Sequence, residues 1–282
     1  MLVELIKYGF IFGILLSLIS LGFSLIYNVL KIVDFAHADR LTLAGYSFYV
    51  LSFHLNVFNS ILFSLAITIA FAILTERLVY SSMRKNGSSA LMLTSFGFSI
   101  IIQSLLAMIF TSEIKPTNIR EHVIGNTGFY SRELILIPVL ILFLVLLIYF
   151  FKKTKAGISI RAIISNNERA LFYKLPIKKY ISIIFGISGF LAGIAGVSLS
   201  ISNGVFPTMG FKYMIYSFAA CIIGGLKNLT GVVVISIFLG ILIVMSEAYI
   251  SALASESLAL MILLLVLILK PNGIFGEKLR EI

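Results

Sequence analysis

The sequence predicts an all-α, polytopic transmembrane helical bundle, and three observations carry that prediction. Of the 282 residues, 60% are hydrophobic and only 12% are charged, which gives a mean hydropathy of +1.08. A soluble domain of this size would carry about twice as much charge. Apolar runs long enough to cross a bilayer as helices recur along the chain, and only short polar stretches separate them. We therefore expect a single transmembrane domain over residues 1–282, with eight or nine spans.

Eight apolar segments are each predicted to form one span: Leu5–Leu30, Leu41–Leu55, Ser60–Val79, Ala90–Phe110, Leu134–Phe151, Ile181–Ile201, Val232–Tyr249 and Leu258–Leu269. A ninth segment, Tyr213–Ile223, is shorter and follows a break at Ser202–Gly210 that contains Pro207. Proline and glycine interrupt helices, and broken helices are tolerated in membranes only against protein or a water-filled cavity. The region 203–226 therefore holds a crossing, a re-entrant segment or a broken helix, and a plain extracellular turn at Pro207 and Gly210 fits equally well.

The orientation follows from a basic island at Lys152–Tyr180, which holds eight basic residues and the single acid Glu168. Short basic segments beside spans stay in the cytoplasm, so we place this loop and the C-terminus on the cytoplasmic side of a bacterial plasma membrane. The loop Thr111–Glu133 has balanced charges and falls outside. Nine crossings place the N-terminus outside, whereas eight leave it open. The net charge of +10 fits cytoplasmic loops that face anionic lipid, and nucleic acid is not expected as a partner.

The segment Ile158–Tyr173 within this loop is predicted to form an amphipathic helix. Ile160, Ile163 and Ile164 share one face with Asn167 and Leu171, and Arg161, Ser165, Glu168 and Arg169 lie on the other. Gly157 marks the turn out of the preceding span, and Pro176 prevents the helix from continuing. The pattern fits a helix that lies on the membrane surface and, equally, a helix that docks a soluble partner.

Ionisable residues near the membrane are candidates for function. Asp34, His37, Asp39 and Arg40 cluster between the first two spans, where we expect them near the membrane edge, with Asp34 and His37 paired on one helical face. An ordinary polar loop also fits. Glu247 lies near the end of its span, and Gln103, inside another span, is expected to form an interhelical hydrogen bond.

The sequence argues against an enzyme. It has one cysteine, three histidines and no HExxH motif, so we expect no metal site, and it has no P-loop that would bind ATP. Gly186–Gly189 reads Gly-Ile-Ser-Gly, as in intramembrane serine proteases. Such proteases need a histidine on a later span, and no histidine follows His122. We therefore expect a chain without catalytic residues and without a cofactor of its own.

A series of motifs, in this order, resembles the permease subunits of branched-chain amino-acid ABC importers (LivH/LivM type) over nearly the whole chain. The motifs are Asp34-Phe-Ala-His-Ala38, Gly157-x-x-x-Arg161-Ala162 with Ala170 downstream, Phe185–Gly196, Pro207-x-x-Gly210, Gly224-Gly225 and Lys270–Gly276. Asp34 stands where the family usually has Asn, and Ala38 stands where Gly is usual. These two departures bear on the substrate, because relatives carry urea, short amides, other amino acids or sugars.

The resemblance implies a permease for branched-chain or hydrophobic amino acids, or for a related small solute. It also implies a second permease subunit, like or unlike, two cytoplasmic ATPases that bind ATP, and an extracytoplasmic solute-binding protein. The loop 152–180 would carry a coupling helix whose ATPase-contacting residues include Gly157, Ile160, Arg161, Ala162, Ser165 and Ala170. Candidates for the translocation path are Asp34, His37, Pro207, Gly210 and Glu247. The alternative is a secondary transporter driven by an ion gradient, which would need mid-membrane carboxylates.

Overall fold

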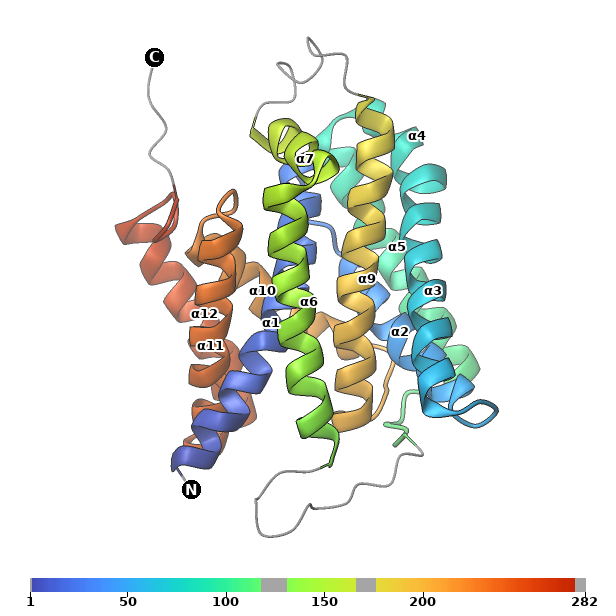
Figure 1. Ribbon diagram of the computed structural model, residues 1–282, viewed down its shortest axis with the longest axis vertical. Helices are drawn as coiled ribbons and strands as arrows, with labels where there is room; N and C mark the ends of the chain where they lie inside the picture. Colours follow the sequence, from blue (N-terminus) through green and yellow to red (C-terminus); the bar gives the residue numbers. More distant parts are fainter. Residues whose placement is uncertain (1, 118–130, 166–175, 277–282) are drawn as a thin grey trace.

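The computed structural model describes residues 2–117, 131–165 and 176–276, and all repetitive secondary structure in these residues is helical, as predicted. The N-terminus lies at one end of the bundle, and α7 lies across the other end (Figure 1). In chain order the elements are α1 (Leu2–Leu30), α2 (Ala36–Leu51), α3 (Val57–Leu74), the π-helical turn η1 (Thr75–Tyr80), α4 (Ser81–Met83), the 3-10 turn η2 (Arg84–Asn86), α5 (Ser88–Phe110), α6 (Ser131–Lys153), α7 (Lys155–Ser165), α9 (Ile177–Asn203), α10 (Met209–Gly224), α11 (Leu229–Tyr249) and α12 (Ala252–Leu269).

The long helices separate into a core and an outer layer. Five described segments are long and apolar enough to cross a membrane: Leu2–Leu30, Val57–Asn86, Ser88–Phe110, Ile177–Asn203 and Leu229–Tyr249. In α1, 83% of the most apolar window is buried, against 22% in each of the segments that contain α3 and α5. Helix α1 is therefore a central element, and α3 and α5 present apolar side chains outward.

Glycines allow the central helices to approach one another closely. A Cβ atom on Gly240 of α11 would overlap the backbone of Gly13 in α1, and Gly189 of α9 packs in the same way against Ala72 of α3. Helices in membranes associate through such small residues because lipid supplies no hydrophobic driving force between them. Gly13, Gly240 and Gly189 therefore mark sites of close helix–helix contact.

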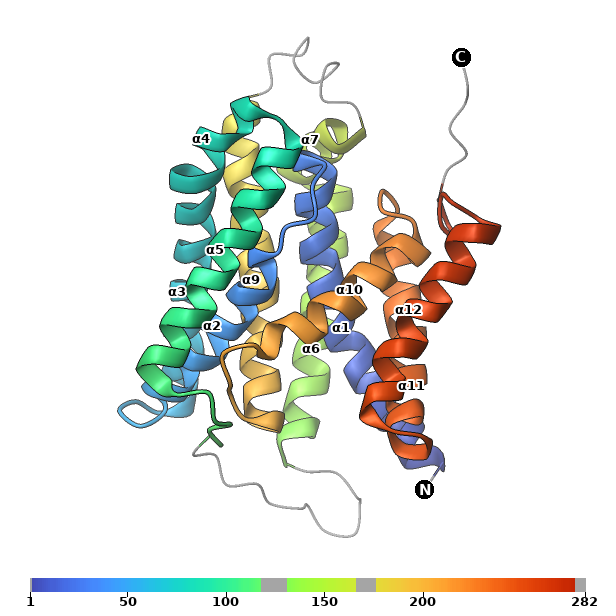
Figure 2. The same ribbon diagram turned by 180° about the vertical axis from the view of Figure 1, so that it is seen from behind.

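Two long helices are each followed by a segment that turns back into the bundle. Lys31 has a φ of 57°, and the chain after α1 returns inward before α2 begins (Figure 2). Gly204 has a φ of 74°, and the chain after α9 returns in the same way before α10 begins. Both returning helices have 16 residues and start inside the bundle, and α1 and α9 run in opposite directions. The expected break near 203–226 is present, whereas an equivalent break before α2 was not predicted.

Candidate functional site

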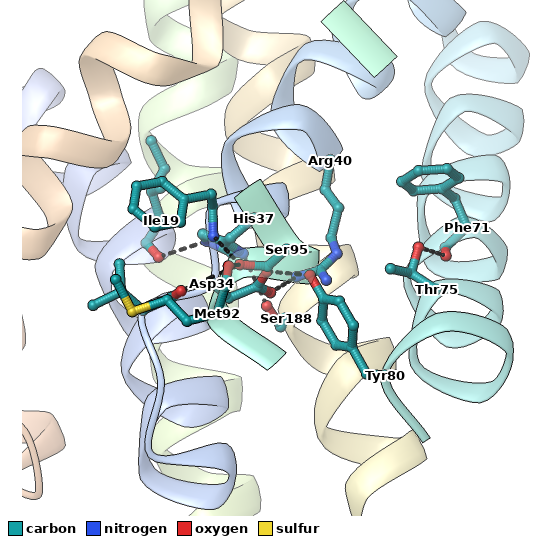
Figure 3. Close-up of polar contacts among 12 residues, drawn as sticks. Ile19, Asp34, His37, Arg40, Phe71, Thr75, Tyr80, Met92, Ser95 and Ser188 are labelled. Carbon is teal, nitrogen blue, oxygen red and sulfur yellow. Dashed lines mark hydrogen bonds and ion pairs between the residues drawn. The ribbon is translucent and has the colours of Figure 1, made fainter. Parts of the chain in front are cut away.

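A buried charge cluster surrounds the start of α2. Nη1 of Arg40 lies 2.9 Å from Oδ2 of Asp34, and the hydroxyl of Tyr80, at the end of η1, donates a hydrogen bond to Oδ1 of Asp34 (Figure 3). All three residues are fully buried. The expectation that Asp34 and Arg40 lie near a membrane edge is wrong, because the segment from Lys31 to Phe35 carries them into the bundle interior.

The guanidinium of Arg40 keeps unused donors. Its Nη1 is held by the ion pair with Asp34, and within the part of the chain that the structure describes no hydrogen-bond partner lies beside Nε or Nη2. The guanidinium carbon lies 5.0 Å from the ring centroid of Phe185, which gives a cation–π contact. Buried charges inside a membrane are costly and mark substrate or ion pathways. Arg40 is therefore a candidate ligand for an anionic group.

The π-helical turn η1 brings Tyr80 to this cluster. The backbone N–H of Ser81 donates to the carbonyl oxygen of Glu76, which is the i→i+5 pattern of a π-turn. Thr75, Glu76 and Tyr80 are consequently all buried, although the turn also contains exposed residues. Such turns occur frequently at functional sites. Tyr80 was not predicted as a site residue, because the amino-acid sequence does not indicate a change from α- to π-helical hydrogen bonding.

Asp39 extends the polar interior toward α5. Nε2 of Gln103 donates to Oδ1 of Asp39 at 3.0 Å and to the hydroxyl of Ser99 at 3.0 Å. The other carboxylate oxygen of Asp39 is buried, and no described residue forms a hydrogen bond with it. The interhelical hydrogen bond expected of Gln103 is confirmed. Two carboxylates, those of Asp34 and Asp39, thus lie inside the bundle.

His37 connects three helices. Its Nε2 lies 3.1 Å from the carbonyl oxygen of Ile19 in α1, and its Nδ1 lies 3.1 Å from the hydroxyl of Ser188 in α9 (Figure 3). Because a carbonyl only accepts, Nε2 carries the proton and Nδ1 accepts from Ser188. Asp34 is bonded to Arg40 and Tyr80 instead, so the predicted Asp34–His37 pair is wrong. Ser188 belongs to the Gly-Ile-Ser-Gly sequence, and its histidine partner lies on an earlier span instead of a later one. The side chains of His37 and Ser188 are both fully buried, and their hydrogen bonds hold α1, α2 and α9 together.

The start of α10 packs directly against α2. The backbone N–H of Gly210 donates to the hydroxyl of Thr42 at 3.1 Å, and a Cβ atom on Gly210 would overlap the carbonyl oxygen of Ala38. Pro207 is buried in the break just before α10. The structure therefore brings four of the five path candidates into one region: Asp34, His37, Pro207 and Gly210.

The fifth path candidate, Glu247, belongs to a separate ion pair. Its Oε1 lies 2.9 Å from Nζ of Lys212 in α10, and the hydroxyl of Ser255 donates to the same oxygen at 3.2 Å. The side chains of Lys212 and Glu247 are 33% and 36% exposed. Lys212 was missed as a candidate, although a lysine between two aromatic residues of an apolar stretch is a visible signal.

Helix α7 presents one face to the bundle and one outward. Ile160, Ile163 and Ile164 are buried, which confirms that these three share a face, whereas Arg161 and Ala162 are exposed. Ile160 is therefore unavailable to an ATPase, in contrast to the expectation, because its side chain helps anchor α7 to the bundle. A Cβ atom on Gly157 would overlap the carbonyl oxygen of Phe150, so glycine is required where α6 bends into α7. The side chain of Ser165 is not among those that the structure describes. Three further predicted residues, Asn167, Ala170 and Leu171, lie wholly outside the described residues.

The comparisons with known proteins agree with this arrangement. Residues 5–270 match the family described as the permease component of branched-chain amino acid transport systems. The chain belongs to this family. It is 24% identical to the high-affinity branched-chain amino acid transport system permease protein LivH of Escherichia coli K12 over 288 residues, which covers 95% of this chain and 94% of LivH. BraD of Pseudomonas aeruginosa PAO1, a permease protein of the same kind of system, is 24% identical over 293 residues, with coverage of 95% and 94%.

A solved structure supports the fold. PsaBC from Streptococcus pneumoniae in complex with Fab aligns with a TM-score of 0.53 and 15% identity, over 96% of this chain and 97% of that one. At this identity the likeness concerns the fold alone.

Two motifs from the C-terminal part of this permease, Gly224-Gly225 and Lys270–Gly276, are in direct contact. The N–H of Ile274 donates to the carbonyl oxygen of Ile223 at 2.7 Å, and Gly225 and Gly273 have φ values of 88° and 83°. A Cβ atom on Gly273 would lie 2.7 Å from the backbone nitrogen of Gly225. The Gly-Gly turn after α10 and the Lys-Pro-Asn-Gly turn after α12 therefore form one close-packed unit, for which glycine is required on both sides.

Proposed function

We propose that this chain is the transmembrane subunit of an ATP-driven importer that carries branched-chain or other hydrophobic amino acids, or a related small solute. The observation that carries this proposal is the family match over residues 5–270, which overlaps every described helix. LivH and BraD are permease proteins of branched-chain amino acid transport systems, and each aligns with nearly all of this chain. In this function the chain is not itself an enzyme and has no cofactor of its own.

The interior of the bundle supports a solute path near the starts of α2 and α10. The N-terminal end of a helix carries a partial positive charge, and transporters use such ends inside the membrane to hold anionic groups of a substrate. Arg40 adds unpaired donors close to the start of α2. A substrate carboxylate is the kind of group that these features suit. Asp34, His37, Pro207 and Gly210 would line this path, with Glu247 and Lys212 on its flank.

Helix α7 is the surface that we assign to coupling. Two cytoplasmic ATPases would bind ATP and contact its exposed face through Arg161 and Ala162, and the tight bend at Gly157 would transmit their motion to α6. A second permease subunit, identical or different, would complete the pore. An extracytoplasmic binding protein would deliver the solute at the opposite end.

The charge distribution supports a cytoplasmic location for the α7 end and the C-terminus. The segments that meet at this end are the end of α1, the stretch from η1 to η2, the end of α6, α7, the start of α9 and the turns after α10 and α12. In or next to these segments lie the basic residues Lys31, Arg77, Arg84, Lys85, Lys152, Lys153, Lys155, Arg161, Lys178, Lys179, Lys227 and Lys270. Partial burial, and then the charge of Lys227, lower the pKa of Lys31. An excess of Lys and Arg beside spans marks the cytoplasmic face. The chain would thus be a multi-pass protein of the bacterial inner membrane.

Uptake by reconstituted vesicles tests the proposal. The chain is co-purified with its ATPases and second permease, placed in proteoliposomes loaded with ATP, and given radiolabelled leucine with the binding protein outside. We expect uptake that requires both internal ATP and the binding protein. Arg161→Glu should abolish uptake while the complex still inserts, whereas Lys153→Glu, at the end of α6 next to α7, should retain it. Uptake by the chain alone under an ion gradient would contradict the proposal and support a secondary transporter.

A further inference from the structure

A pocket of about 810 Å³ opens at the α7 end of the bundle, away from the charge cluster at α2. It lies between the end of the α3 segment and the start of α9. Small-molecule sites in proteins have volumes of about 300–1,000 Å³, so the pocket can hold a ligand of substantial size. Its rim carries five basic residues: Arg77, Arg84, Lys85, Lys178 and Lys179.

Most of this positive charge is uncompensated. Nη2 of Arg84 lies 2.9 Å from Oε1 of Glu76, and the hydroxyl of Ser182 donates to the other oxygen of Glu76 at 2.9 Å. Glu76 is therefore fully engaged within the pocket. The remaining four cations have no ion-pair partner among the residues that the structure describes, and all four are exposed. The rim thus attracts an anion.

The floor of the same pocket is apolar. Ile73, Ile183 and Gly186 lie deeper than the cations, toward the middle of the bundle. On the outer surface of the adjoining turn, Leu74 is 52% and Leu78 is 70% exposed. A free phosphate ion would gain nothing from this floor and this surface, whereas a hydrocarbon chain would be buried against both.

We propose that this pocket binds the headgroup phosphate of an anionic glycerophospholipid, with the acyl chains running along α3 past Leu74 and Leu78. Basic pockets between transmembrane helices on the cytoplasmic side are suited to such headgroups. The proposal uses the orientation given above but does not depend on the transported solute. The lipid would also lie against η1, the π-turn that places Tyr80 on Asp34.

Native mass spectrometry of the purified chain in detergent tests this binding. Phosphatidylglycerol is titrated against phosphatidylcholine with the same acyl chains, and the adducts are counted. The pocket variant is Arg77→Gln/Lys178→Gln/Lys179→Gln, and the control Lys153→Gln/Lys155→Gln/Lys270→Gln removes three exposed charges from the same end. Each basic residue near an anionic lipid contributes about fivefold in affinity, so the pocket variant should bind phosphatidylglycerol roughly a hundredfold more weakly. The control should stay within about threefold of the parent.

Four results would count against the proposal. Equal losses of phosphatidylglycerol affinity in the two variants would mean that binding depends on the net charge of the protein alone. Equal binding of the two lipids by the parent would mean that the protein does not distinguish an anionic headgroup from a neutral one. Displacement of phosphatidylglycerol by inorganic phosphate at millimolar concentration would indicate a free-anion site. A further variant, Gly186→Leu, places a side chain over the floor next to Ile73, and unchanged phosphatidylglycerol binding in this variant would also count against the site.

Discussion

The segments α1–α2 and α9–α10 share a backbone plan but differ in chemistry. Each has a long helix, a break with a positive φ, and a 16-residue helix that begins inside the bundle, and the two run in opposite directions. The first turns of α2 hold Asp39 and Arg40 buried beside Asp34, whereas the charge in the first turn of α10, Lys212, is 33% exposed. One start is thus fixed by buried charge and the other by close backbone contact. Opposed repeats of this kind form the central sites of many transporters.

Removal of the charge on the α2 side should have the largest effect. Arg40→Leu leaves Asp34 buried with a charge and no cationic partner, and breaking a buried ion pair in this way costs about 3–5 kcal/mol. Thermal unfolding in lipid nanodiscs measures the loss through a thiol-reactive dye. The dye reports Cys221, the single cysteine of the chain, which is fully buried until the protein unfolds.

The double variant Asp34→Asn/Arg40→Leu is the control for this prediction. It removes both charges, and replacement of a buried ion pair by neutral groups is often harmless. Most of the lost stability should return, and a double variant as unstable as Arg40→Leu would show that the charge pair is not what holds the start of α2.

A substitution at the α10 start should have an intermediate effect. The Cβ atom of Gly210→Ala would overlap the carbonyl oxygen of Ala38 and push α10 away from α2, and overpacking of this kind costs about 1–3 kcal/mol. Gly97→Ala in α5 is the matched control, because no atom lies within 4 Å of its Cβ position. The control should be neutral or more stable by about 0.5–1 kcal/mol. Equal melting of the two variants would contradict the close contact between α2 and α10.

The sequence predicted most of the fold because apolar runs largely determine where helices lie. The expected span Ala90–Phe110 became α5, Ser88–Phe110, and Ile181–Ile201 became α9, Ile177–Asn203. The return of the chain before α2 could not be predicted in this way. A polar stretch that follows Lys31 has the composition of a loop at the membrane edge, and hydropathy alone assigns it there.

The candidate site was predictable only in part, for the same physical reason. Burial of Asp34, His37 and Asp39 depends on partners from distant segments, namely Tyr80, Ser188 and Gln103, and no local pattern indicates these pairings. Periodicity correctly placed Ile160 with Ile163 and Ile164 on one face of α7. It did not indicate whether that face would meet the bundle or a soluble partner.

The smallest effect should come from the ion pair between Lys212 and Glu247 on the α10 side. Lys212 and Glu247 are each about one-third exposed, and ion pairs with that access to water contribute about 0–1 kcal/mol. Lys212→Gln, Glu247→Gln and the double variant form a cycle whose coupling energy is read from the same Cys221 melting assay. The coupling should shrink further between about 0.1 M and 1 M salt, because the screening length falls from about 10 Å to about 3 Å. A coupling as large as the loss in Arg40→Leu would mean that α10, like α2, is held by charge, and the contrast between the two returning helices would then fail.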